Sequence, residues 1–203
     1  MSKTNILIKR FLDSIVSFLV LIVCFPLLII LFVIANISTK ENGFYTNTRI
    51  GKQGRPFVMW KIRSMKSYPA INTSVTTQCD PRITPFGRFL RQTKLDELPQ
   101  LWNVLKGDMS LVGPRPDVPG FADKLEGDNR KILTVRPGIT GLATLSFRNE
   151  EILLSKQKNP EKYNLEVIWP EKVRLNKYYI EHYSLWLDFK ILFKTVFGGK
   201  ISI

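Results

Sequence analysis

Residues 15–37 read IVSFLVLIVCFPLLIILFVIANI and contain no charged side chain. A helix of this length would measure about 33 Å, which is enough to cross the hydrocarbon core of a bilayer. A secretory signal peptide would have a shorter apolar run followed by a small-residue cleavage site, and the end of this run fits that pattern poorly. The sequence therefore predicts a membrane helix in front of a more polar region.

Pro26 lies at the midpoint of the apolar run, where it removes a backbone donor and clashes with the preceding turn. Two structures accommodate it: a kinked helix that spans the membrane, and a re-entrant hairpin whose arms return to one face. Basic flanks prefer the cytoplasm, so a span exports one basic flank and a hairpin exports neither. The residues alone slightly favour the span because spans are common. Both alternatives leave the region after Ile37 in the cytoplasm.

The formal net charge is +13, and the excess begins directly after the apolar run. Residues 42–95 contain ten Lys or Arg side chains and one acid, Asp80, whereas residues 96–203 contain sixteen and fourteen. An anionic partner is therefore expected, and nucleic acid, anionic lipid and a phosphorylated substrate all fit. Two cysteines, Cys24 and Cys79, and a single histidine, His182, argue against a zinc site or a disulfide framework.

The polar region is predicted to be α+β and mainly helical. A short strand pair is expected between residues 44 and 60, around the turn at Gly51–Gly54, and a short helix from Pro85 to Gln92. In residues 93–107, TKLDELPQLWNVLKG, the apolar spacing predicts a second helix that ends at Gly107. Its apolar face is expected to carry Leu98, Leu101, Trp102 and Leu105.

Asp96 and Glu97 precede Pro99, which is tolerated only in the first turn of a helix. The two carboxylates therefore lie at or beside a helix N-terminus. An ordinary interpretation makes Asp96 the N-cap, because Asp is a preferred capping residue. The functional interpretation is a carboxylate nucleophile, with or without a metal ion, surrounded by cations that hold phosphates.

Two further segments combine arginine with proline and glycine: LVGPRP at residues 111–116 and VRPGITG at 135–141. Proline fixes the backbone direction and glycine allows close approach of a ligand, so Arg115 and Arg136 are suited to phosphate contacts. Solvated surface turns are an equally good interpretation of either segment. Near the C-terminal end, aromatic side chains alternate with lysines, which predicts either an interfacial helix or an ordinary amphipathic core helix.

The motifs KIRSM at 61–65, LDELPQLWN at 95–103, GDMSLVGPRP at 107–116 and RPGITG at 136–141 resemble those of the bacterial sugar transferase family. These are small monotopic phosphoglycosyl transferases, and the resemblance covers nearly the whole chain. It implies a re-entrant, proline-broken membrane helix at residues 1–40, with Pro26 at the turn. It also implies a cytoplasmic phosphoglycosyl transferase domain at residues 41–203, with amphipathic interfacial helices, at the bacterial inner membrane.

The resemblance further implies transfer of a sugar 1-phosphate from a UDP-sugar to polyprenyl phosphate, with release of UMP, in the first membrane step of surface glycan assembly. Asp96 would be the nucleophile and would form an aspartyl phospho-sugar intermediate, with Glu97 beside it and Mg²⁺ on both carboxylates. The substrate-binding residues would be Lys61, Arg63, Arg91, Arg115, Arg136 and Gly138. Contacts with downstream glycosyltransferases and formation of homo-oligomers stay open.

Two departures from the family pattern are present. Many members have Ser before the proline of the membrane helix, whereas this chain has Phe25. After Gly141 the chain continues into a longer charged insertion, where sugar selection is expected to differ. The rival hypotheses are a membrane-tethered protein that binds nucleic acid and a scaffold for glycan enzymes. Neither explains the carboxylate pair or the arginines beside prolines, and no nucleic-acid-binding motif is present.

Overall fold

The computed structural model describes residues 3–68, 76–77, 80–199 and 201, so Cys79 lies outside the described residues. Within these ranges the chain is mainly helical, with two small sheets, as the α+β prediction requires. The helices are α1 (Lys3–Thr39), α2 (Pro85–Thr93), α3 (Gln100–Lys106), α4 (Leu142–Ser146), α5 (Glu150–Ser155), α6 (Pro160–Tyr163), α7 (Trp169–Glu181) and α8 (Leu185–Phe197). The strands are β1 (Phe44–Ile50), β2 (Pro56–Ile62), β3 (Ser110–Val112) and β4 (Gly138–Thr140).

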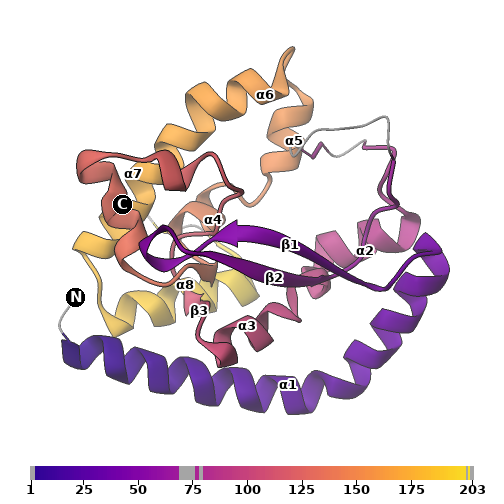
Figure 1. Ribbon diagram of the computed structural model, residues 1–203, viewed down its shortest axis with the longest axis horizontal. Coiled ribbons are helices and arrows are strands. Elements are labelled where there is room, and N and C mark those ends of the chain that lie inside the picture. Colours follow the sequence, from indigo (N-terminus) through magenta and orange to yellow (C-terminus); the bar gives the residue numbers. More distant parts are fainter. Residues whose placement is uncertain (1–2, 69–75, 78–79, 200, 202–203) are drawn as a thin grey trace.

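Helix α1 is long and apolar enough to cross a membrane, and Pro26 lies inside it. The helix continues through the proline, which leaves one carbonyl of the preceding turn without its helical donor. Figure 1 shows that α1 bends and that the rest of the molecule lies on the inner side of the bend. The segment is therefore one bent helix, without the sharp turn that two separate hairpin arms would need.

The N-terminal arm of α1 is attached to the polar region by hydrogen bonds. Arg10 donates through one guanidinium nitrogen to the carbonyl of Leu105, at 2.7 Å, and through the other to the carbonyl of Val104. These carbonyls belong to the last turn of α3, where carbonyl groups have no N–H partner within the helix. Asp13 is buried and accepts from the hydroxyl of Ser110 at 2.6 Å.

The C-terminal arm of α1 packs through apolar side chains. Leu31 and Ala35 are buried against Ile62 of β2 and Leu90 of α2. Both arms of the bent helix thus contact the same body of the protein, one by polar and the other by apolar contacts.

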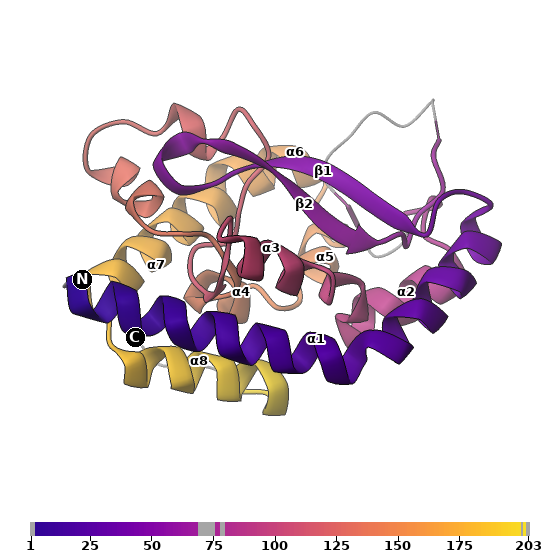
Figure 2. The same ribbon diagram turned by 60° about the horizontal axis from the view of Figure 1, so that its bottom comes forward.

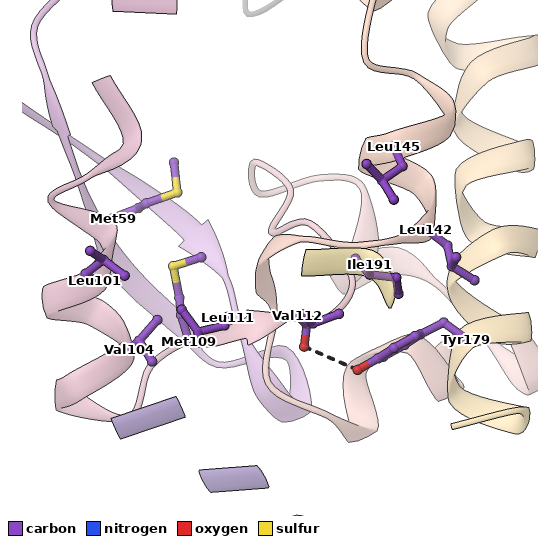
Figure 3. Close-up of a cluster of buried hydrophobic side chains, with 10 residues drawn as sticks. All are labelled: Met59, Leu101, Val104, Met109, Leu111, Val112, Leu142, Leu145, Tyr179 and Ile191. Atoms are coloured by element: carbon purple, nitrogen blue, oxygen red, sulfur yellow. Dashed lines mark hydrogen bonds between the residues drawn. The ribbon is translucent and has the colours of Figure 1, made fainter. Parts of the chain in front are cut away.

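The main core lies between β2, α3, β3, α4, α7 and α8. Figure 3 shows its ten buried side chains: Met59, Leu101, Val104, Met109, Leu111, Val112, Leu142, Leu145, Tyr179 and Ile191. Tyr179 also places its hydroxyl against Asp188 of α8, at 2.6 Å, and Asp188 accepts from Lys9 of α1 at the same distance. A chain of polar contacts therefore joins α7, α8 and α1 beneath the core.

The local sequence predictions are largely confirmed. Strands β1 and β2 pair antiparallel, from Phe44 with Ile62 to Ile50 with Pro56. Helix α2 begins at Pro85, and α3 is terminated by Gly107 in the left-handed conformation. The predicted apolar face of α3 is wrong at Trp102, which is 57% exposed, because α3 buries the face that carries Leu101, Asn103 and Val104.

Helix α8 has two different faces. It buries Ile191 and Asp188, and exposes the aromatic residues Trp186, Phe189, Phe193 and Phe197. Figure 2 shows α8 beside α1 on one side of the molecule, and α1 also exposes many large apolar side chains there. An exposed apolar surface of this extent favours the interfacial interpretation of α8 over the core-helix interpretation.

The attachment of α1 through Asp13 can be tested by thermal unfolding of the purified protein. Asp13→Ala leaves the buried hydroxyl of Ser110 without its carboxylate partner, so we expect a loss of about 1–3 kcal/mol and a lower Tm. Ser14→Ala is the matched control, because the hydroxyl of Ser14 bonds only the carbonyl of Arg10 in its own helix. Equal Tm shifts in the two variants would show that Asp13 does not attach the helix.

Candidate active site

Asp96 and Glu97 lie in a short 3-10 turn, Leu95–Glu97, between α2 and α3. Lys94 ends α2 in the left-handed conformation, with φ of 59°, and so reverses the chain before the turn. Adjacent residues in a 3-10 turn point about 120° apart, which directs the two carboxylates to different surroundings. Both carboxylates are buried. The N-cap of α3 is Pro99, so the interpretation of Asp96 as that cap is wrong.

Glu97 is held by two cations. The guanidinium of Arg115 donates to both carboxylate oxygens, at 2.5 and 3.3 Å, and Lys61 Nζ donates to Oε1 at 3.2 Å. Burial alone would raise the pKa of Glu97, but Arg115 and Lys61 outweigh that effect and hold it well below its ordinary value. Glu97 is therefore a permanent anion that orients Arg115 and Lys61.

Asp96 differs from its neighbour both in its partners and in the direction of its pKa shift. Its Oδ1 atom is buried and has no hydrogen-bond partner among the described residues. Burial raises the pKa of Asp96, and the negative charge of Glu97 raises it further, whereas Lys61 lowers it. A buried carboxylate oxygen without a partner is costly to maintain, and such groups concentrate at functional sites.

Two more of the predicted cations line the same cavity as the carboxylates. Arg91, on α2, pairs with Glu151 of α5, and its buried Nε has no partner among the described residues. Arg63 pairs with Glu41 at 2.8 Å. Lys61, Arg63, Arg91 and Arg115 are thus brought to one cavity with the two carboxylates, as the sequence motifs predict.

Arg136 and Gly138 are not brought into this cavity. Arg136 donates through Nε to the carbonyl of Gly107 and lines a small separate hollow beside Arg10. Gly138 is buried in β4, where a Cβ atom would lie 2.1 Å from the backbone nitrogen of Gly113. The structure gives Arg136 a role in terminating α3 and Gly138 a role in close packing of β3 against β4.

The sequence reasoning missed further charged residues of the cavity, among them Arg49, Asp117 and Lys172. Burial raises the pKa of Asp117 to about 7, and the charges of Lys172 and Arg49 partly oppose this. Lys172 also pairs with Glu150, at 2.7 Å. The signal for Asp117 was its place directly after Arg115-Pro116, because a rigid turn fixes the next side chain as well. Arg49 and Lys172 lie in segments without a distinguishing motif.

The cavity has a volume of about 1120 Å³ and spans more than the carboxylates. Its polar part contains the cations described above, and its apolar part reaches residues of α1 and α8. A nucleophilic oxygen, several fixed cations and room for a large substrate suit displacement at phosphorus. These are the groups that a carboxylate-based phosphate-transfer centre needs, and they lie next to an apolar surface.

A Mg²⁺ ion fits Asp96 better than Glu97. Mg²⁺ is usually bound by one or two carboxylates together with substrate phosphates. The Oδ1 atom of Asp96 has no hydrogen-bond partner among the described residues, whereas both oxygens of Glu97 accept from cations. The described residues contain no group of three or more His, Cys, Asp or Glu side chains that could hold a metal by themselves.

Comparison with known proteins agrees with this description. A family model described as bacterial sugar transferase matches residues 4–199. The UDP-glucose:undecaprenyl-phosphate glucose-1-phosphate transferase of Escherichia coli (strain K12) is 38% identical over 210 residues, covering 100% of this chain and 42% of that protein. The undecaprenyl-phosphate galactose phosphotransferase of Salmonella typhimurium is 36% identical over 206 residues, covering 93% and 39%.

A third relative, the UDP-galactose-lipid carrier transferase of Erwinia amylovora, is 34% identical over 207 residues, covering 93% of this chain and 39% of that protein. The chain thus spans about two fifths of the length of these curated relatives. The chain belongs to the bacterial sugar transferase family.

The opposite pKa shifts of the two carboxylates predict opposite stability effects. The folded-state pKa of Asp96 is raised, so its charge costs stability above that pKa and costs nothing below its ordinary value of 3.8. Asp96→Asn should therefore raise Tm near pH 7.5, with a gain that disappears as the pH falls toward 3.8. The folded-state pKa of Glu97 is lowered, so its charge stabilises the fold at neutral pH, and Glu97→Gln should lower Tm.

The measurement is Tm against pH for both variants and the wild type. Shifts of about 2–4 °C correspond to ~1 kcal/mol in a protein of this size. Tm changes of the same sign in the two variants at pH 7.5 would contradict the opposite pKa shifts of Asp96 and Glu97.

Proposed function

We propose that the protein transfers a sugar 1-phosphate from a UDP-sugar to polyprenyl phosphate and releases UMP. The observation that carries the proposal is the unpartnered carboxylate oxygen of Asp96 in a cavity lined by cations. The names of two relatives support the substrates: one is a UDP-glucose:undecaprenyl-phosphate glucose-1-phosphate transferase and the other an undecaprenyl-phosphate galactose phosphotransferase. Such a product fits the first membrane step of surface glycan assembly.

In the first step, the Oδ1 atom of Asp96 attacks the phosphorus atom that carries the sugar. A bond forms between Oδ1 and phosphorus, and the bond to the bridging oxygen breaks, so that UMP leaves with the electron pair. The product on the protein is an aspartyl phospho-sugar, a mixed anhydride. Arg115 and Lys61, oriented by Glu97, neutralise negative charge on the phosphate oxygens.

In the second step, a phosphate oxygen of the polyprenyl phosphate attacks the same phosphorus. The new bond completes a pyrophosphate, and the Asp96 carboxylate is restored as the bond to it breaks. Mg²⁺, when bound at Asp96, would supply further neutralisation of phosphate charge. Burial of the carboxylates limits the access of water, which would otherwise hydrolyse the anhydride.

We also propose that α1 enters and leaves the membrane on the cytoplasmic side. Both arms of the bent helix contact one body: Arg10 reaches the end of α3, and Leu31 packs on Leu90 of α2. A spanning helix would carry one arm away from that body to the other side of the bilayer. The bend at Pro26 keeps both basic flanks on one side, as their charge prefers.

The nucleophile assignment predicts that Asp96→Asn releases no UMP from any UDP-sugar that serves the wild-type protein. An amide oxygen is a far weaker nucleophile than a carboxylate, so neither UMP nor a covalent protein-sugar adduct should form. The measurements are UMP release and the intact mass of the protein after incubation with the UDP-sugar. Asp80→Asn is the control, since Asp80 pairs with Arg82 at 2.7 Å and does not line the cavity. Near-normal UMP release by Asp96→Asn would refute the assignment.

The topology is tested by Ser2→Cys in a background without Cys24 and Cys79, using a membrane-impermeant thiol reagent on intact cells. We expect no labelling until the membrane is opened. Pro26→Leu should straighten α1 and bring part of the population to a spanning state in which Cys is labelled. Full labelling of the proline-containing protein on intact cells would show a span, and it would leave the catalytic assignment untouched.

A further inference from the structure

The cavity around Asp96 extends to residues that a UDP-sugar does not need. Val20 on α1 and Leu192 and Thr195 on α8 line it, although these helices contain none of the cations that face Asp96. Figure 2 shows that α1 and α8 run in the same direction along one side of the molecule. The cavity therefore reaches between two helices whose outer faces are apolar.

An ion pair joins the two helices near their N-terminal ends. Lys9 of α1 pairs with Asp188 of α8 at 2.6 Å, with side chains that are 12% and 10% exposed. Further along, Val20 lies about three turns beyond Lys9, and Leu192 about one turn beyond Asp188, at 3.6 residues per turn. Val20 and Leu192 both pack partly buried against the main core cluster. We define the slot as the part of the cavity lined by Val20, Leu192 and Thr195.

Outside the slot, the exposed faces of α1 and α8 are strongly apolar. On α1, Val23 is 78% exposed, and on α8, Val196 is 72% exposed and Phe193 is also exposed. Apolar surfaces of this size are found where a protein meets lipid or a partner. A hydrocarbon chain lying in the membrane could thus pass between the helices without contact with water.

The inner end of the slot changes from apolar to polar. The hydroxyls of Thr195 and Thr140 are hydrogen-bonded at 2.7 Å. Thr144 lines the same cavity, and its buried hydroxyl has no partner among the described residues. A free hydroxyl can donate to a phosphate oxygen, so the slot is apolar at Val20 and Leu192 and has a phosphate-binding end at Thr144.

We propose that this slot is the binding site for the prenyl chain of the acceptor lipid, and that Thr144 receives its phosphate. The proposal rests on the proposed function and adds the path by which the acceptor reaches the phospho-sugar on Asp96. The occupant is an amphiphile with a long hydrocarbon chain and a terminal phosphate, because the slot is apolar at Val20 and Leu192 and polar at Thr144. A phospholipid acyl chain is the competing occupant, and the experiment below separates the two.

The experiment fills the slot with a large side chain and measures the two half-reactions separately. Val20→Trp and Thr195→Trp are compared with Val23→Trp and Val196→Trp, which place the same residue on the exposed surface of the same two helices. The first reading is UMP released per protein molecule without acceptor, using the UDP-sugar that serves the wild type. The second is the rate of sugar-phosphate transfer after polyprenyl phosphate is added in detergent micelles.

For the slot variants we expect transfer to fall ~10-fold or more while UMP release changes by no more than ~2-fold, because only acceptor contacts are lost. The Val23 and Val196 variants should transfer at the wild-type rate. A wild-type rate of sugar-phosphate transfer in all four variants would overturn the proposal. A phospholipid acyl chain would then be the better occupant of the slot. An equal loss in the slot and surface pairs would overturn it as well.

A smaller change covers the case in which tryptophan disturbs the fold. Val20→Ala removes apolar contact without adding bulk, so it should raise KM for polyprenyl phosphate more than KM for a short prenyl phosphate. Equal changes for the long and short acceptors would refute the slot. If the wild-type protein releases UMP from no UDP-sugar, the proposed function itself fails, which is a separate result.

Discussion

The buried carboxylate of Glu97 is the group on which the arrangement of the site depends. A charge in this position must be paired, since an unpaired one would cost several kcal/mol. Its partners come from distant segments: Lys61 is in β2, and Arg115 follows β3. Pairing therefore requires the hairpin, the 3-10 turn and the second sheet to meet at one point. The same contacts fix two cations at the wall of the cavity, so the stabilising interaction is also the one that builds the site.

The pairing of Glu97 with these two cations also affects its neighbour, Asp96. Because Lys61 and Arg115 are engaged by Glu97, Asp96 keeps an oxygen without a hydrogen bond. Glu97 is thus a permanent anion that orients cations, and Asp96 is a carboxylate with an unpartnered oxygen and a raised pKa. This division is the usual physical route by which one environment gives two like groups different chemical roles.

The sequence predicted local features well and spatial relations only where rigid motifs carried them. The hairpin, α2 and the end of α3 at Gly107 followed from turn and capping chemistry. Arg115 was found because prolines on both sides mark it, whereas Arg49 lies in an ordinary strand and reaches the cavity only through the fold. Arg136, like Arg115, lies in a segment rich in proline and glycine, yet it donates to the end of α3. Local pattern does not determine which surface a turn faces.

The exposure of Trp102 and the shape of α1 also show that local sequence pattern does not determine tertiary contacts. Apolar spacing predicted a buried face for α3, but the face is chosen by what packs against it, and here Asn103 and Val104 point inward. The apolar run predicted a membrane helix, and its proline predicted either a kink in a span or the turn of a hairpin. The continuous bent helix reflects the contacts of both arms with one body, which are tertiary and have no signature in the run itself.

The polar attachment of α1 also sets an order for assembly. Lys9 and Asp188 are separated by 179 residues in the sequence, and Asp13 and Ser110 by 97. During synthesis α1 is made long before these partners, so Lys9 and Asp13 must stay hydrated until then. Closing such long loops is slow, because their entropy is lost before the contacts form. The ion pair between α1 and α8 can therefore form only when nearly the whole described chain has been made.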